Sequence, residues 1–166
     1  MTRGYGLPAT DPTGLDNAVA VGPVRLGSEP SIDQARLGDS LPYPASTFDT
    51  AVCALIIHCV VDQPASFSEL YRVVLQGGVL IVSTQHPTTD WLRYGGSYSD
   101  TVLETDTWRL RDGDQHVRFW REPLSALCAA ATDSGWLIER LIEPRPAETM
   151  RDHARDVPGG LRPTAS

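Results

Sequence analysis

FDTAVCALIIHCVVDQPASFSELYRVVLQGGVLIVSTQ, residues 48–85, contains two uncharged apolar runs separated by a helical pattern. The first run is TAVCALII at residues 50–57, and the second is VLIV at residues 79–82. Short runs that are apolar on both faces are typical of strands buried in a parallel sheet. We therefore expect both runs to be central strands.

The segment between the two runs has the signals of one amphipathic helix. Asp62 can cap its start, and Pro64 is tolerated in its first turn. An apolar stripe at helical spacing follows, formed by Phe67, Leu70, Tyr71 and Val74. Gly77 and Gly78 are expected to end the helix, because glycine adopts the left-handed end conformation without strain. Strand, helix and strand in this order predict a βαβ unit with a right-handed crossover.

The composition limits the classes of function. A chain of 166 residues is expected to form one domain, and its net charge of −7 argues against a surface for nucleic-acid phosphates. No apolar run reaches the ~20 residues of a membrane span, and the first residues have no apolar signal core. The three cysteines form no C-x-x-C pair, which favours buried, reduced side chains and a cytoplasmic location.

The residues before the βαβ unit carry weaker signals. Residues 1–31 have glycine and proline at turn frequency and are predicted to be irregular, although 19–24 can form a short strand interrupted by a glycine-proline pair. Residues 33–37 can form another short strand, and residues 41–44 an extended link stiffened by proline. The domain itself is expected to cover residues 32–146.

An inserted lid is predicted after the βαβ unit, at residues 88–121. Within it, Asp112-Gly113 between residues 102–110 and 115–121 is the signal of a β-hairpin. Six aromatic residues lie in this region: Trp91, Tyr94, Tyr98, Trp108, Phe119 and Trp120. They suit the wall of a small-molecule pocket, and the alternative is a small core that holds the hairpin together.

The last part of the chain completes the predicted architecture. A helix is expected from Pro123 to Gly135, a strand at 136–142, and a polar tail at 147–166. The predicted fold class is α/β, with a partial Rossmann-like sheet of central parallel strands, flanking helices and the inserted hairpin.

Several motifs together resemble one known family. The residues are Gly38-Asp39 with Leu41-Pro42-Tyr43, Phe48-Asp49, His58, and Glu69 and Arg72 leading to Gly77-Gly78. Over roughly residues 32–148 the chain resembles class I S-adenosylmethionine-dependent methyltransferases, in the small-molecule "type 11" branch. The resemblance implies a Rossmann-like methyltransferase fold, S-adenosylmethionine as cofactor, and methyl transfer to a small molecule.

The chain also departs from the family pattern. The family begins with a strand and a glycine-rich loop around the methionine end of the cofactor, and residues 1–31 show no counterpart. The chain therefore resembles a family member truncated at its N-terminus, and the strand at 50–57 is expected to have an open edge. Three outcomes stay open: a partner chain or second copy covers that edge, residues 17–37 pair there, or the protein is a non-catalytic remnant.

The resemblance implies contacts with the adenosine end of the cofactor. At the position of Asp39 the family's carboxylate accepts the adenine amino hydrogen, and the backbone N–H of the next residue, here Ser40, meets the ring. Leu55 and Ile56, at the end of the first buried strand, are expected beside the cofactor. The alternative for Asp39 is an ordinary turn aspartate after glycine.

Two histidines follow the two predicted strands. His58 can accept a proton from a substrate hydroxyl or amine as the methyl group arrives, and His86 can border the substrate. The alternatives are a histidine packed at a strand end and a polar turn residue before Pro87. The four histidines share no ligand spacing with each other or with the cysteines, so no metal site is expected.

The sequence leaves two functions from different classes. The first is an S-adenosylmethionine-dependent methyltransferase that acts on a small molecule, without nucleic-acid or membrane partners. The second is a non-catalytic interaction module that pairs with another chain through its open strand edge. The missing glycine-rich loop favours the second function for the chain in isolation. A parallel strand beside residues 50–57, with backbone N–H groups open at its carboxyl end, would favour the first.

Overall fold

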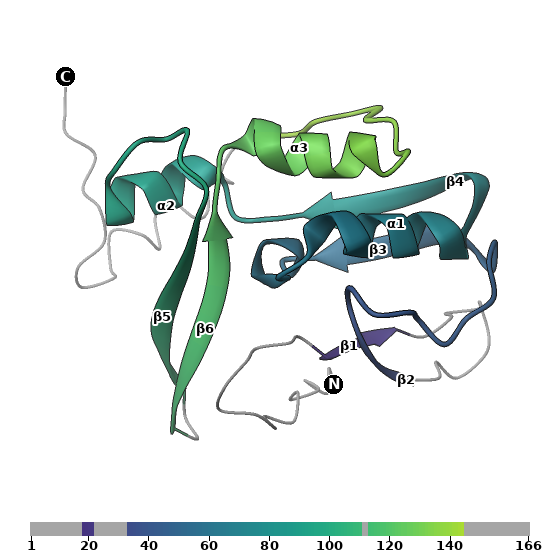
Figure 1. Cartoon of the computed structure of the whole chain (residues 1–166), viewed down its shortest axis with the longest axis horizontal. Coiled ribbons are helices and arrows are strands. Elements are labelled where there is room, and N and C mark those ends of the chain that lie inside the picture. The colour runs from purple at the N-terminus through teal and green to yellow at the C-terminus, as the bar shows by residue number, and fades with distance from the viewer. Residues whose placement is uncertain (1–17, 22–32, 111–112, 145–166) are drawn as a thin grey trace.

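The computed structural model describes residues 18–21, 33–110 and 113–144. The elements follow each other as β1 (Ala18–Val21), β2 (Asp33–Arg36), β3 (Phe48–Ala54), the 3₁₀ turn η1 (Ile57–Cys59), α1 (Gln63–Val73), β4 (Val74–Ser83), α2 (Pro87–Tyr94), β5 (Val102–Leu110), β6 (Gly113–Arg121) and α3 (Leu124–Asp133). Figure 1 shows α1 and α3 packed beside the β3–β4 pair, with the β5–β6 hairpin and α2 at the other end of the molecule.

The predicted βαβ unit is confirmed. β3 and β4 pair in parallel, with Thr50 opposite Val79 and Ala54 opposite Ser83. Asp62 caps α1 as expected, because its carboxylate accepts a hydrogen bond of 2.9 Å from the backbone N–H of Ala65.

The predicted end of the first strand is wrong by several residues. β3 ends at Ala54, and Leu55 takes the left-handed backbone conformation with φ of 53°. This turn leads into η1, whose Ile57 side chain is completely buried in the core. The strand ends early because the chain must turn inward to bury Ile57.

The predicted end of the helix is also wrong. α1 ends at Val73, before the glycine pair, because another segment of the chain satisfies its last carbonyl groups. The backbone N–H groups of Ser46 and Thr47 donate to the carbonyl oxygens of Arg72 and Val73 over 2.8 and 2.7 Å. No left-handed glycine is needed at this helix end.

Gly77 and Gly78 instead lie inside β4, where the register shifts. Phe48 is opposite Val74 while Thr50 is opposite Val79, so β4 bulges between these pairs. Gly77 has a φ of 80°, and a Cβ at Gly78 would lie 2.7 Å from the carbonyl oxygen of Asp49. Glycine is required here for the left-handed conformation and for the close approach of two backbones.

The hydrophobic core lies on one face of the β3–β4 pair. Its buried members are Leu37, Leu41, Cys53, Ile57, Val60, Phe67, Leu70, Val73, Val74 and Leu127. Phe67 and Leu70 of the predicted helical stripe are therefore confirmed, and Val74 is buried as well but belongs to β4. Tyr71 is half exposed and packs edge-on against Trp136 at 5.3 Å. The opposite face of the pair exposes Val52, Val79 and Ile81 by 67, 50 and 51 %.

The prediction for residues 123–142 is half correct. α3 begins directly after Pro123, and Gly135 follows its end with φ of 98°, as expected. The predicted strand at 136–142 is wrong, because no described strand pairs with these residues. Trp136 fixes the start of this segment by donating from its indole N–H to the carbonyl oxygen of Phe67 over 3.0 Å.

The two remaining strand pairs are antiparallel. The predicted hairpin is confirmed, with β5 and β6 in register from Val102–Arg121 to Leu110–Gly113. β1 and β2 pair with each other and not with β3, so that within the described residues β3 pairs only with β4. The irregular segment expected at 1–31 contains the strand β1, and its residues 1–17 and 22–31, like the tail at 147–166, lie outside the described residues.

Candidate functional site

The carboxyl ends of β3 and β4 lie together, as they must in a parallel pair. Ligands of open α/β sheets bind beyond this edge. Leu55, Ile56 and His58 follow β3 here, and Thr84 follows β4. The chain topology therefore brings three predicted site residues to the edge where a ligand is expected.

Leu55 presents an unusual backbone at this edge. Its side chain is exposed, and its backbone N–H donates to the carbonyl oxygen of Ser83 over 2.9 Å. Non-glycine residues in the left-handed region are uncommon and concentrate at functional sites. Ile56, the next residue, is partly buried and packs against the core, which anchors the turn.

His58 is half buried and paired with a side chain from the neighbouring strand. Its Nδ1 lies 3.1 Å from the hydroxyl oxygen of Thr84. Burial lowers the pKa of the His58 imidazole below its ordinary value, so the ring is neutral at neutral pH. A neutral imidazole has one ring nitrogen free of hydrogen, which is the state a proton acceptor needs.

The pKa of His58 has a consequence for stability. The unfolded chain takes up a proton near pH 6.5 and the folded chain only at lower pH, so stability falls as the pH drops below about 6.5. Replacement of His58 by asparagine should therefore flatten the dependence of the urea midpoint on pH between 5.5 and 7.5. A His116→Asn variant, whose histidine is exposed on the hairpin, is the control. An unchanged slope in His58→Asn would contradict the burial of this imidazole.

The 38–43 turn begins beside the residues that follow η1 and the first turn of α1. A Cβ at Gly38 would come within 3.9 Å of the carbonyl oxygen of Asp62 and 4.0 Å of the Val60 side chain, just beyond η1. Asp39 and Ser40 are exposed, while Leu41 is buried in the core. The turn thus points polar groups outward from an anchored apolar residue.

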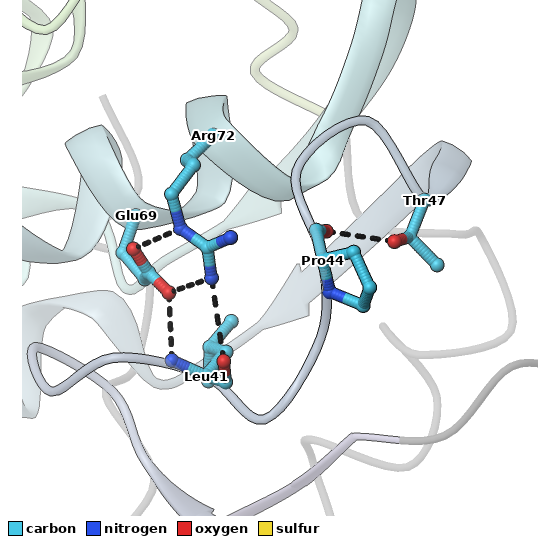
Figure 2. A network of polar contacts seen from close by, with 5 residues as sticks. All are labelled: Leu41, Pro44, Thr47, Glu69 and Arg72. Carbon is cyan, nitrogen blue, oxygen red and sulfur yellow. Dashed lines mark hydrogen bonds and ion pairs between the residues drawn. The ribbon is translucent and has the colours of Figure 1, made fainter.

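A pair of charges on α1 holds this turn, as Figure 2 shows. Glu69 Oε1 accepts a hydrogen bond of 2.6 Å from the backbone N–H of Leu41, and Arg72 Nη2 donates to the carbonyl oxygen of Leu41 over 3.3 Å. The two side chains also form an ion pair with each other. This contact joins residues that are far apart in the sequence, and the motif alone did not reveal it.

His86 is used differently from His58. Its Nδ1 accepts a hydrogen bond of 3.1 Å from the backbone N–H of Thr88 and so caps the start of α2. Its Nε2 lies 2.6 Å from Glu143 Oε1. Both ring nitrogens therefore have protein partners, which matches a structural role in this state of the chain.

Four of the six aromatic residues of the insertion pair with one another, whereas Trp108 is half exposed. Trp91 packs edge-on against Tyr98 at 6.2 Å, and Tyr94 lies 5.8 Å from Phe119. Trp120 reaches out of the hairpin, and its indole N–H donates to the carbonyl oxygen of Val60 over 2.9 Å. These contacts favour the small core over an open wall, and Trp120 fastens the hairpin beside the edge that carries His58.

The insertion also contains a buried polar cluster that no sequence pattern indicated. Arg121 Nε donates to Glu104 Oε1 over 2.9 Å, and Gln85 donates to buried Asp90 over 2.5 Å. Burial raises the pKa of the Asp90 carboxyl, while Arg93 and Arg121 act in the opposite direction. Single charged residues spread over a helix and two strands give no local sequence pattern, so only the fold reveals the cluster.

The part of the chain that the structure describes contains no group of three or more histidine, cysteine, aspartate or glutamate side chains placed to hold a metal ion. None of the three cysteines, at positions 53, 59 and 128, takes part in a disulfide. Among the described helices, none is long and apolar enough to cross a membrane.

Comparison with known proteins shows a similarity to methyltransferases over part of the chain. Residues 16–82 match the family model described as a methyltransferase domain, which includes β1, β3, α1 and most of β4. The match begins before residue 32, where the sequence resemblance was expected to start.

Two solved S-adenosylmethionine-dependent methyltransferases have the same fold. The structure from Listeria monocytogenes gives a TM-score of 0.56 at 18 % identity, covering 74 % of this chain and 62 % of that one. The structure from Mesorhizobium loti gives 0.51 at 20 % identity, covering 72 and 58 %.

Two curated relatives extend the comparison. The chain is 33 % identical over 99 residues to the malonyl-[acyl-carrier protein] O-methyltransferase of Serratia marcescens, covering 57 % of this chain and 34 % of the relative. It is 33 % identical over 103 residues to the biotin biosynthesis bifunctional protein BioHC of Saccharophagus degradans, covering 61 and 17 %. The chain thus spans about a third or less of the length of these relatives.

These matches agree on the kind of domain that the chain resembles. Residues 16–82 are similar to a methyltransferase domain, and the described residues have an α/β fold similar to the Rossmann-like fold of the two solved methyltransferases. Both solved structures are named as methyltransferases that depend on S-adenosylmethionine.

Proposed function

We propose that this chain binds S-adenosylmethionine and takes part in methyl transfer to a small molecule. The observation that supports it best is the 38–43 turn, which begins near the residues that follow η1, is held by Glu69 of α1 and lies within the segment that matches the family model. Binding of a cofactor would explain why this turn is exposed and polar and is also held firmly in place.

The residues of this turn and of the carboxyl end of β3 suit the adenosine end of the cofactor. Asp39 has an exposed carboxylate that can accept the adenine amino hydrogen, and the backbone N–H of Ser40 can meet the ring. Leu55 offers an exposed apolar side chain, and Ile56 lies beside it. The sequence of residues 1–31 contains no glycine-rich loop of the family pattern, so the fit concerns the adenosine end.

When bound, the cofactor supplies an electrophilic methyl group on a sulfonium sulfur. The protein's part is to hold the nucleophile at attack distance, and a base is needed only where the nucleophile carries a proton. His58, neutral and beside Thr84, is the candidate base. His86 borders the same end of β4. To contact a substrate, its Nε2 would have to break the hydrogen bond with Glu143. The relative from Serratia marcescens is named as an O-methyltransferase, so oxygen nucleophiles are the first substrates to test.

The proposal is tested by calorimetric titration of the whole chain with S-adenosylhomocysteine. We expect saturable binding, and loss of a hydrogen bond to a carboxylate in Asp39→Ala should weaken it about 10-fold or more. Asp133→Ala, which removes an exposed carboxylate at the end of α3, is the control and should bind like the wild type. A folded wild-type chain that does not bind would contradict the proposal.

One observation favours a second function, a non-catalytic interaction module. The face of the β3–β4 pair opposite the core exposes Val52, Val79 and Ile81, and no described strand covers the other edge of β3. A second copy of the chain is the partner to test first. Sedimentation equilibrium should then show a dimer that Ile81→Lys dissociates, whereas a monomeric wild type would exclude this form of the module.

A further inference from the structure

The ion pair on α1 acts on the turn that carries Asp39 and Ser40. We propose that Glu69 and Arg72 are positioning residues for the cofactor: they hold the backbone of Leu41 from both sides and so fix the two preceding residues for contact with adenine. This inference rests on the proposed function and deepens it, because neither side chain is itself placed against the cofactor.

The geometry shows how one ion pair can fix a backbone. Glu69 binds the N–H of Leu41, and Arg72 binds its carbonyl oxygen, over 2.6 and 3.3 Å. A second bond of 2.8 Å, from Arg72 Nε to Glu69 Oε2, keeps the two side chains in register with each other. With both polar groups of one residue held, the peptide planes on either side of Leu41 lose their freedom to rotate.

The carboxylate reaches further along the turn. Hydrogen bonds from the Arg72 side chain lower the pKa of the Glu69 carboxyl, and the backbone N–H of Leu41 and the Ser40 side chain add to the effect. The charged carboxylate therefore contacts two successive residues of the turn. The Ser40 side chain is one of these contacts, while the preceding Asp39 stays exposed.

Burial of Leu41 alone would not give this result. Its side chain is only 3 % exposed and anchors the turn to the core, but this burial by itself does not hold the N–H and carbonyl groups of the backbone. A turn that must be ordered on binding loses affinity to the cost of ordering, and a turn already held avoids that cost. The side chain of Glu69 is 15 % exposed and that of Arg72 is 35 % exposed, so solvent screens the pair only partly.

A purely stabilising ion pair is the alternative, and a double-mutant cycle separates the two roles. We would measure the dissociation constant of S-adenosylhomocysteine for the wild type, Glu69→Gln, Asp39→Ala and the double variant. If Glu69 acts through the turn, each single variant raises the dissociation constant about 10-fold. The double variant then raises it by no more than about 20-fold, because the effects of contacts in one network are not additive. Independent effects would multiply to about 100-fold and overturn the inference. Glu139→Gln, an exposed glutamate outside the turn, is the matched control.

Amide hydrogen exchange gives a readout that does not depend on the ligand. In Glu69→Gln the amides of Ser40 and Leu41 should exchange faster, while those of Leu70 and Val73 in α1 keep their protection. Arg72→Met, which removes the bond to the Leu41 carbonyl, is the second variant if Glu69→Gln folds poorly. Unchanged exchange at Leu41 in a folded variant would overturn the inference even if the wild type binds. Absence of binding by the wild type would overturn the proposed function and this role together, whatever the exchange shows.

Discussion

Replacement of Phe67 by alanine is expected to lower the free energy of unfolding by about 3–5 kcal/mol, the cost of truncating a fully buried aromatic ring. The Phe67 side chain is only 1 % exposed and belongs to the core cluster between α1, the β3–β4 pair and α3. Its backbone carbonyl also accepts the hydrogen bond from Trp136. Small domains have little stability to lose, so this change removes much of it. Urea unfolding followed by circular dichroism measures the effect.

The control for this prediction is an apolar residue outside the core. Leu137 is 92 % exposed, so Leu137→Ala should change the free energy of unfolding by no more than about 0.5 kcal/mol. Equal losses in the two variants would contradict the placement of the core beneath α1.

Replacement of Arg121 by alanine should have the second largest effect, a loss of about 3 kcal/mol or more, typical of breaking a buried ion pair from one side. The Arg121 side chain is 10 % exposed and that of Glu104 is 23 % exposed. Without the guanidinium group, Glu104 and the buried Asp90 are left as like charges in the same cluster. Arg121 lowers the pKa of Asp90, so the pKa of this carboxyl should rise in the variant, and the loss should shrink as the pH is lowered from 7 toward 5.

Arg93 offers a matched comparison in the same insertion. It pairs with Asp106 over 2.9 Å, but its side chain is 60 % exposed. Arg93→Ala should therefore cost no more than about 1 kcal/mol, as solvent-exposed pairs usually do. If Arg93→Ala cost as much stability as Arg121→Ala, burial would not decide the contribution of these pairs. The same conclusion would follow if the loss in Arg121→Ala grew as the pH was lowered.

The fold could be predicted where local patterns and packing agree. The βαβ unit could be predicted from two apolar runs, at 50–57 and 79–82, and from a helix cap at Asp62. Apolar runs and helix caps act over short distances, so the local sequence contains their signals. The errors arise where distant segments decide. α1 ends at Val73 because Ser46 supplies the cap, and residues 136–142 are not a strand because no described strand lies beside them. No pattern within either segment contains this information.

The candidate site shows the same division. The ends of two parallel strands had to meet, so a partner for His58 at the end of β4 follows from topology, although Thr84 itself was not predicted. His86 was correctly placed after β4, but its bonds to Thr88 and Glu143 depend on where the chain returns. Glu69 was noted as part of a family motif, and only the structure connects it to Leu41.

Nuclear magnetic resonance titration of the ¹⁵N-labelled chain with S-adenosylhomocysteine tests whether the 38–43 turn and the carboxyl end of β3 form one cofactor site. We expect the backbone signals of Asp39, Ser40 and residues 55–58 to shift together with a single dissociation constant, while those of α3 do not move. A folded chain whose spectrum does not change, or in which the signals that shift lie away from this edge, would contradict a cofactor site at this place in the fold.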